Sequence, residues 1–194
     1  IWQGAIFRKD VGIPFLLDIK LSKNKQHYLV HVLNGSERLV MDSSYVENDS
    51  LHIPMTMFDA EIVAKVGSEK LEGVWKRYHE GREIGALPFQ ARYNVTYRFH
   101  EDELKPSTTT TTAFSPDEKW STTFYSEDKA DTTQAIGIFE QKGSVVTGTF
   151  LTTTGDYRYL AGYTNKDSLY LSSYDGSHLY LFRAKKNEDG TLEG

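Results

Sequence analysis

Alternation of apolar and polar residues with a period of two is the feature that most constrains how this chain can fold. From Ile13 to Leu21, every second residue is apolar, and Phe58–Val66 and Phe89–Phe99 repeat the pattern. Successive side chains of a strand point to opposite faces, so this period predicts half-buried antiparallel strands. No window places apolar residues at the i, i+3, i+4 and i+7 positions of an amphipathic helix.

Short turn signals separate these strand-like runs. Glycine, asparagine and aspartate tolerate the positive φ that tight hairpin turns require. Such residues recur at Asn34-Gly35, Lys142-Gly143, Thr154–Asp156, Asp175-Gly176 and Asp189-Gly190. Many short strands at this spacing predict an all-β chain, an antiparallel meander that forms lipocalin-like barrel or sandwich modules.

An internal repeat runs through the sequence. Asp49–Ile53 resembles Asp167–Leu171, and the two segments are separated by the same interval as Trp2 and Trp120. Further matches follow in the same order, namely Phe58-Asp59 with Tyr174-Asp175 and Leu71–Gly73 with Leu192–Gly194. Ordered matches of this kind indicate two copies of one β-module.

The repeat predicts the domain organisation. A polar, proline-flanked stretch between the copies contains five consecutive threonines and is typical of a linker. We therefore predict a first β-module at 1–100, a linker at 101–118 and a second β-module at 119–194. The second copy stops at Leu-Glu-Gly, where the first continues through further strands. It is therefore expected to be truncated, with the natural chain continuing past Gly194.

Composition excludes several chemistries. With no cysteine, the chain has no disulfide, thiolate metal site or cysteine nucleophile. A net charge of −5 argues against a nucleic-acid partner, and no apolar run is long enough for a transmembrane segment. His27 and His31 are four residues apart on an expected strand, too far apart to share a metal ion. We predict no catalytic residue, no metal and no cofactor.

Two arginines and two tyrosines are the candidate ligand-binding residues. Arg38 and Arg158 occupy near-equivalent repeat positions in strand-like runs. An arginine that faces the inside of a small barrel can bind a carboxylate or phosphate, whereas one that faces outward covers sheet surface. Tyr157 and Tyr159 begin a tyrosine-rich region, where exposed rings would bind a sugar or a protein and inward rings would pack in the core.

Several segments resemble a known family. They are Asn34–Leu39, Ile84–Ala91, Gly143–Leu160 and Tyr174–His178. These segments resemble the region that precedes the thioredoxin-like domain in secreted thiol-disulfide reductases of Bacteroidetes-type bacteria. The resemblance implies an extracytoplasmic chain, in the periplasm or at the outer membrane, often behind a lipoprotein anchor. It also implies a covalently linked C-terminal thioredoxin-like domain that carries the Cys-x-x-Cys chemistry.

Three functional hypotheses follow. The first is a non-catalytic accessory or binding domain that positions the redox domain or binds a protein partner. The second is a small-molecule carrier of lipocalin-like type, with a ligand enclosed by the barrel. The third is a carbohydrate-binding or carbohydrate-active domain that uses tyrosines and paired carboxylates. The first two hypotheses describe a protein that is not an enzyme.

Overall fold

The chain folds into two compact units. A computed structural model describes residues 1–23, 27–99 and 115–194. Unit 1 comprises Ile1–Arg98 together with Ser173–Leu179, and unit 2 comprises Phe99–Ser172 together with Tyr180–Gly194. Residues 101–114 of the predicted linker lie outside the described residues.

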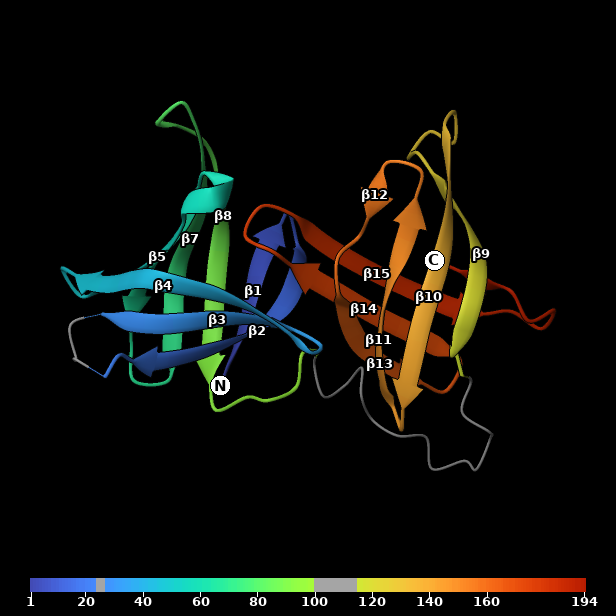
Figure 1. The fold of residues 1–194 in the computed structure, drawn as a ribbon, viewed down its shortest axis with the longest axis horizontal. Helices are drawn as coiled ribbons and strands as arrows, with labels where there is room; N and C mark the ends of the chain where they lie inside the picture. Colours follow the sequence, from blue (N-terminus) through green and yellow to red (C-terminus); the bar gives the residue numbers. More distant parts are fainter. Residues whose placement is uncertain (24–26, 100–114) are drawn as a thin grey trace. The chain divides into compact units, whose positions relative to one another are not determined.

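Unit 1 is a closed barrel of eight antiparallel strands, which confirms the predicted all-β meander and selects the barrel over the sandwich (Figure 1). Each strand pairs with the next along the chain, and β8 pairs with β1 to close the barrel. The elements are β1 (Trp2–Arg8), β2 (Val11–Leu21), β3 (Tyr28–Asn34), β4 (Glu37–Glu47), β5 (Ser50–Met55), the 3-10 turn η1 (Thr56–Phe58), β6 (Ala60–Val66), β7 (Lys70–His79) and β8 (Arg82–Tyr93).

The period-two pattern produces the core of this barrel. In β2, Ile13, Phe15 and Leu17 are buried, and their neighbours in the sequence are more exposed. The same alternation in the other strands points one apolar row from each strand into the interior. Closure leaves no free sheet edge, which removes the aggregation risk of an exposed edge strand.

Unit 2 is a single curled antiparallel sheet. Its strand order is β16-β15-β14-β13-β11-β10-β9, and β12 pairs with β11 beside this path. The strands are β9 (Glu118–Tyr125), β10 (Thr132–Lys142), β11 (Val145–Thr152), β12 (Gly155–Asp156), β13 (Leu160–Asn165), β14 (Ser168–Tyr174), β15 (Leu179–Lys186) and β16 (Leu192–Glu193). Apolar side chains from these strands form a second core around Phe150 and Leu160.

The internal repeat has a structural counterpart. Asp49 precedes β5 and accepts a backbone hydrogen bond from Val66 at the end of β6, at 3.0 Å. Asp167 precedes β14 and accepts the equivalent bond from Lys186 at the end of β15, at 2.7 Å. The matched tryptophans likewise lie in β1 and β9, the first strand of each copy. The two copies therefore share strand order as well as sequence.

The repeated Leu-Glu-Gly sequence marks a close approach between strands. A Cβ atom on Gly73 would lie 2.0 Å from the carbonyl oxygen of Val63. A Cβ atom on Gly194 would lie 1.9 Å from the carbonyl oxygen of Arg183. Only a glycine allows the neighbouring backbones to come this close, which explains why the repeat keeps glycine at both positions.

Gly73→Ala is expected to destabilise unit 1 by about 1–3 kcal/mol, because the added methyl group forces β6 and β7 apart. Urea denaturation of the purified protein measures this change. Gly85→Ala in β8 is the matched control, since no atom lies within 4 Å of the added Cβ. Equal stability of the two variants would show that the close approach of the strands at Gly73 does not affect the free energy of unfolding.

Three local predictions are wrong. The strand predicted at Phe89–Phe99 ends at Tyr93, because Asn94 adopts a positive φ of 57° that a strand cannot continue through. Arg158 was predicted to lie in a strand, but it lies between β12 and β13 with a φ of 59°. The predicted start of a strand at Phe58 is displaced to Ala60 by η1 and by the left-handed Asp59.

Candidate functional site: a cavity at one end of the first barrel

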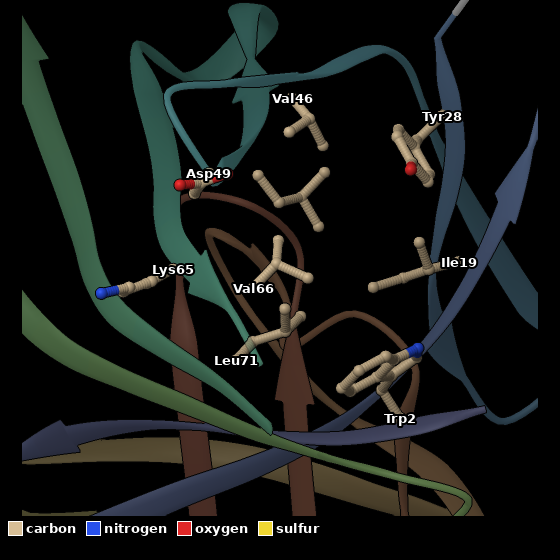
Figure 2. Close-up of a pocket in the computed structure, with 9 residues that line it drawn as sticks. Trp2, Ile19, Tyr28, Val46, Asp49, Lys65, Val66 and Leu71 are labelled. Carbon is tan, nitrogen blue, oxygen red and sulfur yellow. The ribbon is translucent and has the colours of Figure 1, made fainter. Parts of the chain in front are cut away.

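One end of the unit 1 barrel contains a cavity of about 380 Å³. Strands β1 to β7 and the β4–β5 turn contribute to its wall, and most of the wall is apolar (Figure 2). The lining residues are Trp2, Ile19, Tyr28, Val46, Asp49, Leu51, Lys65, Val66 and Leu71. A largely apolar, preformed concavity with a few polar groups is typical of small-molecule sites.

The strand pattern places these side chains. Leu51 and Leu71 occupy inward positions of β5 and β7 and are only 3% and 1% exposed, so they form the floor. Val46 and Val66 are paired in register with these two leucines and are each 45% exposed, so they form the mouth. The inward apolar rows of the strands therefore extend past the packed core, and the cavity lies between their last residues.

Two aromatic rings form the remaining wall. The Trp2 indole packs against the ring of Tyr93 in β8, with ring centroids 5.0 Å apart, which holds the indole in place at the start of β1. Tyr28, at the start of β3, lies beside the same space (Figure 2). Rings of this kind give a ligand a large, rigid contact area.

Two exposed charges lie at the margin of the cavity. Asp49 is the second residue of the β4–β5 turn, and Lys65 is the penultimate residue of β6. Among the described residues, no ion pair joins them to each other or to another side chain. Lys65 alternates along β6 with the inward residues Ala64 and Val66, and Figure 2 shows its ammonium group directed away from the cavity. The Lys65 ammonium group therefore lies on the outer face of the barrel.

The opposite end of the barrel is closed by Tyr174, in the Ser173–Leu179 segment of unit 1. The Tyr174 side chain is fully buried, and its ring packs on Phe15 at 4.5 Å and on the edge of Trp75 at 6.0 Å. Its hydroxyl group donates to the sulfur of Met55 at 2.8 Å. Burial, together with the nearby Asp175 carboxylate, raises the pKa of Tyr174 well above its ordinary value, so the hydroxyl stays protonated.

Asn34 holds the backbone of this closing residue. Its fully buried side-chain amide donates to the Tyr174 carbonyl at 2.8 Å, and its oxygen accepts from the Tyr174 N–H at 3.4 Å. Arg98, also buried, donates to the carbonyl groups of Pro14 and Leu33 at the same end of β2 and β3. These bonds satisfy backbone groups that closure removes from water.

A polar network lies on the outer face of the barrel. The His52 ring stacks on Tyr45 at 4.8 Å and hydrogen-bonds through Nδ1 to Glu61 at 2.9 Å, and Tyr78 donates to the same carboxylate at 3.4 Å. Burial and then the Glu61 charge raise the pKa of Tyr78. These contacts join β4, β5, β6 and β7, so they stabilise the sheet.

None of the predicted site residues lines the cavity. Arg38 is exposed in β4 and is not among the lining residues. Arg158, Tyr157 and Tyr159 belong to unit 2. Tyr157 packs against Phe124 at 5.5 Å and Tyr180 at 4.8 Å, the core packing that was the alternative to ligand binding. Tyr159 is 56% exposed.

Sequence reasoning did not find the lining residues, although a signal for them exists. The inward apolar rows of β4 and β6 continue to Val46 and Val66 at the strand ends, where solvent is close. Exposed apolar residues that gather into one contiguous patch mark a binding surface, whereas scattered ones do not. Recognising them requires the register between strands, which the sequence pattern leaves open.

In the described ranges, no group of three or more His, Asp or Glu side chains could hold a metal ion. Within the part of the chain that the structure covers, no helix has the length and apolar composition needed to cross a membrane. No family model matches the chain, and no curated protein or solved structure matches it significantly.

Proposed function

We propose that unit 1 binds a small, largely apolar molecule in the cavity at the open end of its barrel. The observation that carries the proposal is the apolar cavity itself, since its volume of about 380 Å³ suits a small organic ligand. An eight-stranded barrel is also about the size that can hold one small ligand. This is the carrier hypothesis, located in the first barrel.

The asymmetry of the barrel supports this assignment. Tyr174 fills one end and contacts Phe15 and Trp75, so a ligand has no space there. At the other end, no residue of comparable size among those the structure describes fills the space above Leu51 and Leu71. The apolar floor is therefore available to a ligand, and covering it would remove apolar surface from water.

Blocking the mouth is expected to abolish most of this binding. Val46→Phe combined with Val66→Phe should weaken binding of the neutral dye N-phenyl-1-naphthylamine at least about tenfold, because the two rings occupy the ligand's space. Dye fluorescence titration measures the dissociation constant. Both valines are already half-exposed, so the fold should tolerate the change.

The control places the same two substitutions elsewhere on the barrel. Val11 and Val40 are 45% and 55% exposed and do not line the cavity. Val11→Phe combined with Val40→Phe should leave dye affinity unchanged. Absence of saturable dye binding to the unmodified protein would refute the proposed function, and equal affinity of the two double variants would place the dye elsewhere.

A second candidate rests on the sequence resemblance alone. The Gly143–Leu160 and Tyr174–His178 segments support an accessory, non-catalytic role in an extracytoplasmic protein with a thioredoxin-like domain. A ligand-binding barrel is compatible with that role, because the barrel could bind a partner or ligand for the redox domain. Sequencing the complete gene tests this candidate, which requires a Cys-x-x-Cys pair in a linked domain.

A further inference from the structure

We infer that unit 2 binds an extended peptide strand along the open edge of β9, and that this strand completes a barrel like that of unit 1. The partner is a strand with the residue pattern of β8, in which alternate residues are apolar. Three features support this assignment: the edge position of β9, the partial exposure of the unit 2 core beside that edge, and the internal repeat. The site lies in unit 2 and is independent of the cavity in unit 1.

Unit 2 has an open sheet edge at the position where unit 1 is closed. In unit 1, β1 pairs with β2 on one side and with β8 on the other. Its repeat counterpart β9 pairs with β10 and, among the residues that the structure describes, with no second strand, so it lies at the edge of the sheet (Figure 1). The path from β16 to β9 contains seven strands, one fewer than the unit 1 barrel. The backbone groups along a sheet edge are a template for pairing with a further strand.

The core of unit 2 is incompletely covered beside this edge. Its buried apolar residues lie in the central strands β10, β11, β13 and β14. The apolar residues that pack against them from β9, β15 and β16 are only partly buried, and they include Trp120, Phe124, Phe182 and Leu192. In β1, Ile6 is fully buried, whereas its repeat counterpart Phe124 is not. A strand placed beside β9 would remove this apolar surface from water.

The repeat identifies the kind of strand that fits. In unit 1, Phe89 of β8 is fully buried and lies opposite Ile6 of β1, and Ala91 is the next inward residue of β8. A strand that runs antiparallel to β9 would place the same apolar pair opposite Phe124 and Thr122. The partner is therefore an extended segment with apolar residues at alternate positions, facing the interior of unit 2.

A second copy of the chain fits this edge less well. Pairing between two β9 strands would extend both sheets, but it would leave the inner face of each sheet uncovered. The ring centroids of Phe124 in β9 and Phe182 in β15 are 5.8 Å apart, so these rings face a common interior. A strand between β9 and β16 would cover that interior. The arrangement of the rings therefore favours closure of the barrel over edge-to-edge dimerisation.

The experiment measures binding of a synthetic peptide with the sequence of β8, Arg82–Tyr93, to the full chain. Fluorescence anisotropy of the labelled peptide is expected to show saturable binding. In hydrogen exchange measured by mass spectrometry, Glu118–Tyr125 should exchange at least about tenfold more slowly in the complex, and the strands of unit 1 should not change. A peptide that carries Phe89→Asp and Ala91→Asp should bind at least about tenfold more weakly, because closure would bury two carboxylates.

Two variants of β9 test the face that the peptide covers. Thr122 lies opposite the buried Ala135 of β10, so it faces the interior, and it is itself only partly buried. In Thr122→Asp, peptide affinity should fall at least about tenfold, because the bound strand would remove the new carboxylate from water. Thr123→Asp is the matched control, since Thr123 is also partly buried but faces outward, and peptide affinity should change less than about twofold. If Thr122→Asp fails to fold, the substituted peptide tests the same face.

Four results would overturn this assignment. They are absence of saturable peptide binding, protection that appears elsewhere and not in β9, equal affinity of the two peptides, and equal affinity of the two β9 variants. Analytical ultracentrifugation of the full chain without peptide tests the second copy as occupant. A dimer in which β9 is already protected from exchange would show that the edge pairs with itself, which also overturns the assignment.

Discussion

Replacing Tyr174 by alanine is expected to lower the free energy of unfolding of unit 1 by about 3–5 kcal/mol, the usual cost of removing a buried aromatic side chain. The ring is fully buried between Phe15 and Trp75, and its removal leaves a cavity at the closed end of the barrel. Backbone bonds to Asn34 hold the residue in place, so the segment cannot move easily to fill the space.

Two controls separate the parts of this effect. Tyr174→Phe keeps the ring and removes the hydroxyl bonds to the Met55 sulfur and the Gly176 carbonyl, so a loss of about 0.5–1.5 kcal/mol is expected. Tyr159→Ala removes an exposed tyrosine and should change stability by less than about 0.5 kcal/mol. Urea denaturation followed by fluorescence in a Trp120→Phe background reports on unit 1, where Trp2 and Trp75 remain. Equal stability of the Tyr174→Ala and Tyr159→Ala variants would show that Tyr174 does not stabilise the barrel.

The closing role of Tyr174 could not be predicted from its local sequence. Tyr174-Asp175-Gly176 has the composition of a turn, and a turn is what it forms: Asp175 accepts the backbone N–H groups of Ser177 and His178. Its burial depends on Phe15, Asn34 and Trp75, which are remote in sequence. A turn depends on neighbouring residues and can therefore be predicted from the local sequence. The residues that pack around a buried ring are determined by the tertiary structure.

The strands could be predicted from the sequence for a related reason. Period-two alternation reflects the two faces of a sheet, and a barrel with one apolar interior keeps that alternation in nearly every strand. The pattern failed where backbone conformation overrode it, as at Asn94, which ends β8 although Val95, Tyr97 and Phe99 continue the alternation. Side-chain periodicity contains no information about a single residue with positive φ.

The residues that line the cavity were not among the site residues predicted from the sequence. Arg38 and Arg158 were chosen because the repeat relates them, but sequence equivalence does not determine which way a side chain points. The residues that line the cavity are ordinary apolar residues such as Leu51 and Val66, which have the same pattern as the core. Only the unfilled space above them distinguishes a site from a core, and that space depends on all eight strands at once.

Replacing Phe150 by alanine is expected to destabilise unit 2 by about 3–5 kcal/mol. Phe150 is 7% exposed and lies at the centre of the aromatic cluster of that unit. Its ring centroid is 4.9 Å from that of Phe182, 5.0 Å from Phe124 and 5.3 Å from Phe139. Because Phe124 lies in β9 and Phe182 in β15, Phe150 joins the two sides of the curled sheet through its ring contacts.

Hydrogen exchange measured by mass spectrometry tests this expectation by locating the loss. Peptides from β9, β10 and β11 should exchange faster in Phe150→Ala, because opening these strands costs less once the central ring is gone. Leu151→Ala is the matched control: Leu151 neighbours Phe150 in β11, points to the opposite face and is 40% exposed. If protection from hydrogen exchange falls equally in both variants, the ring cluster does not control the stability of the sheet. Truncation of any β11 side chain would then have the same effect. Protection unchanged in Phe150→Ala would mean that the backbone ladder of unit 2 holds without its aromatic core.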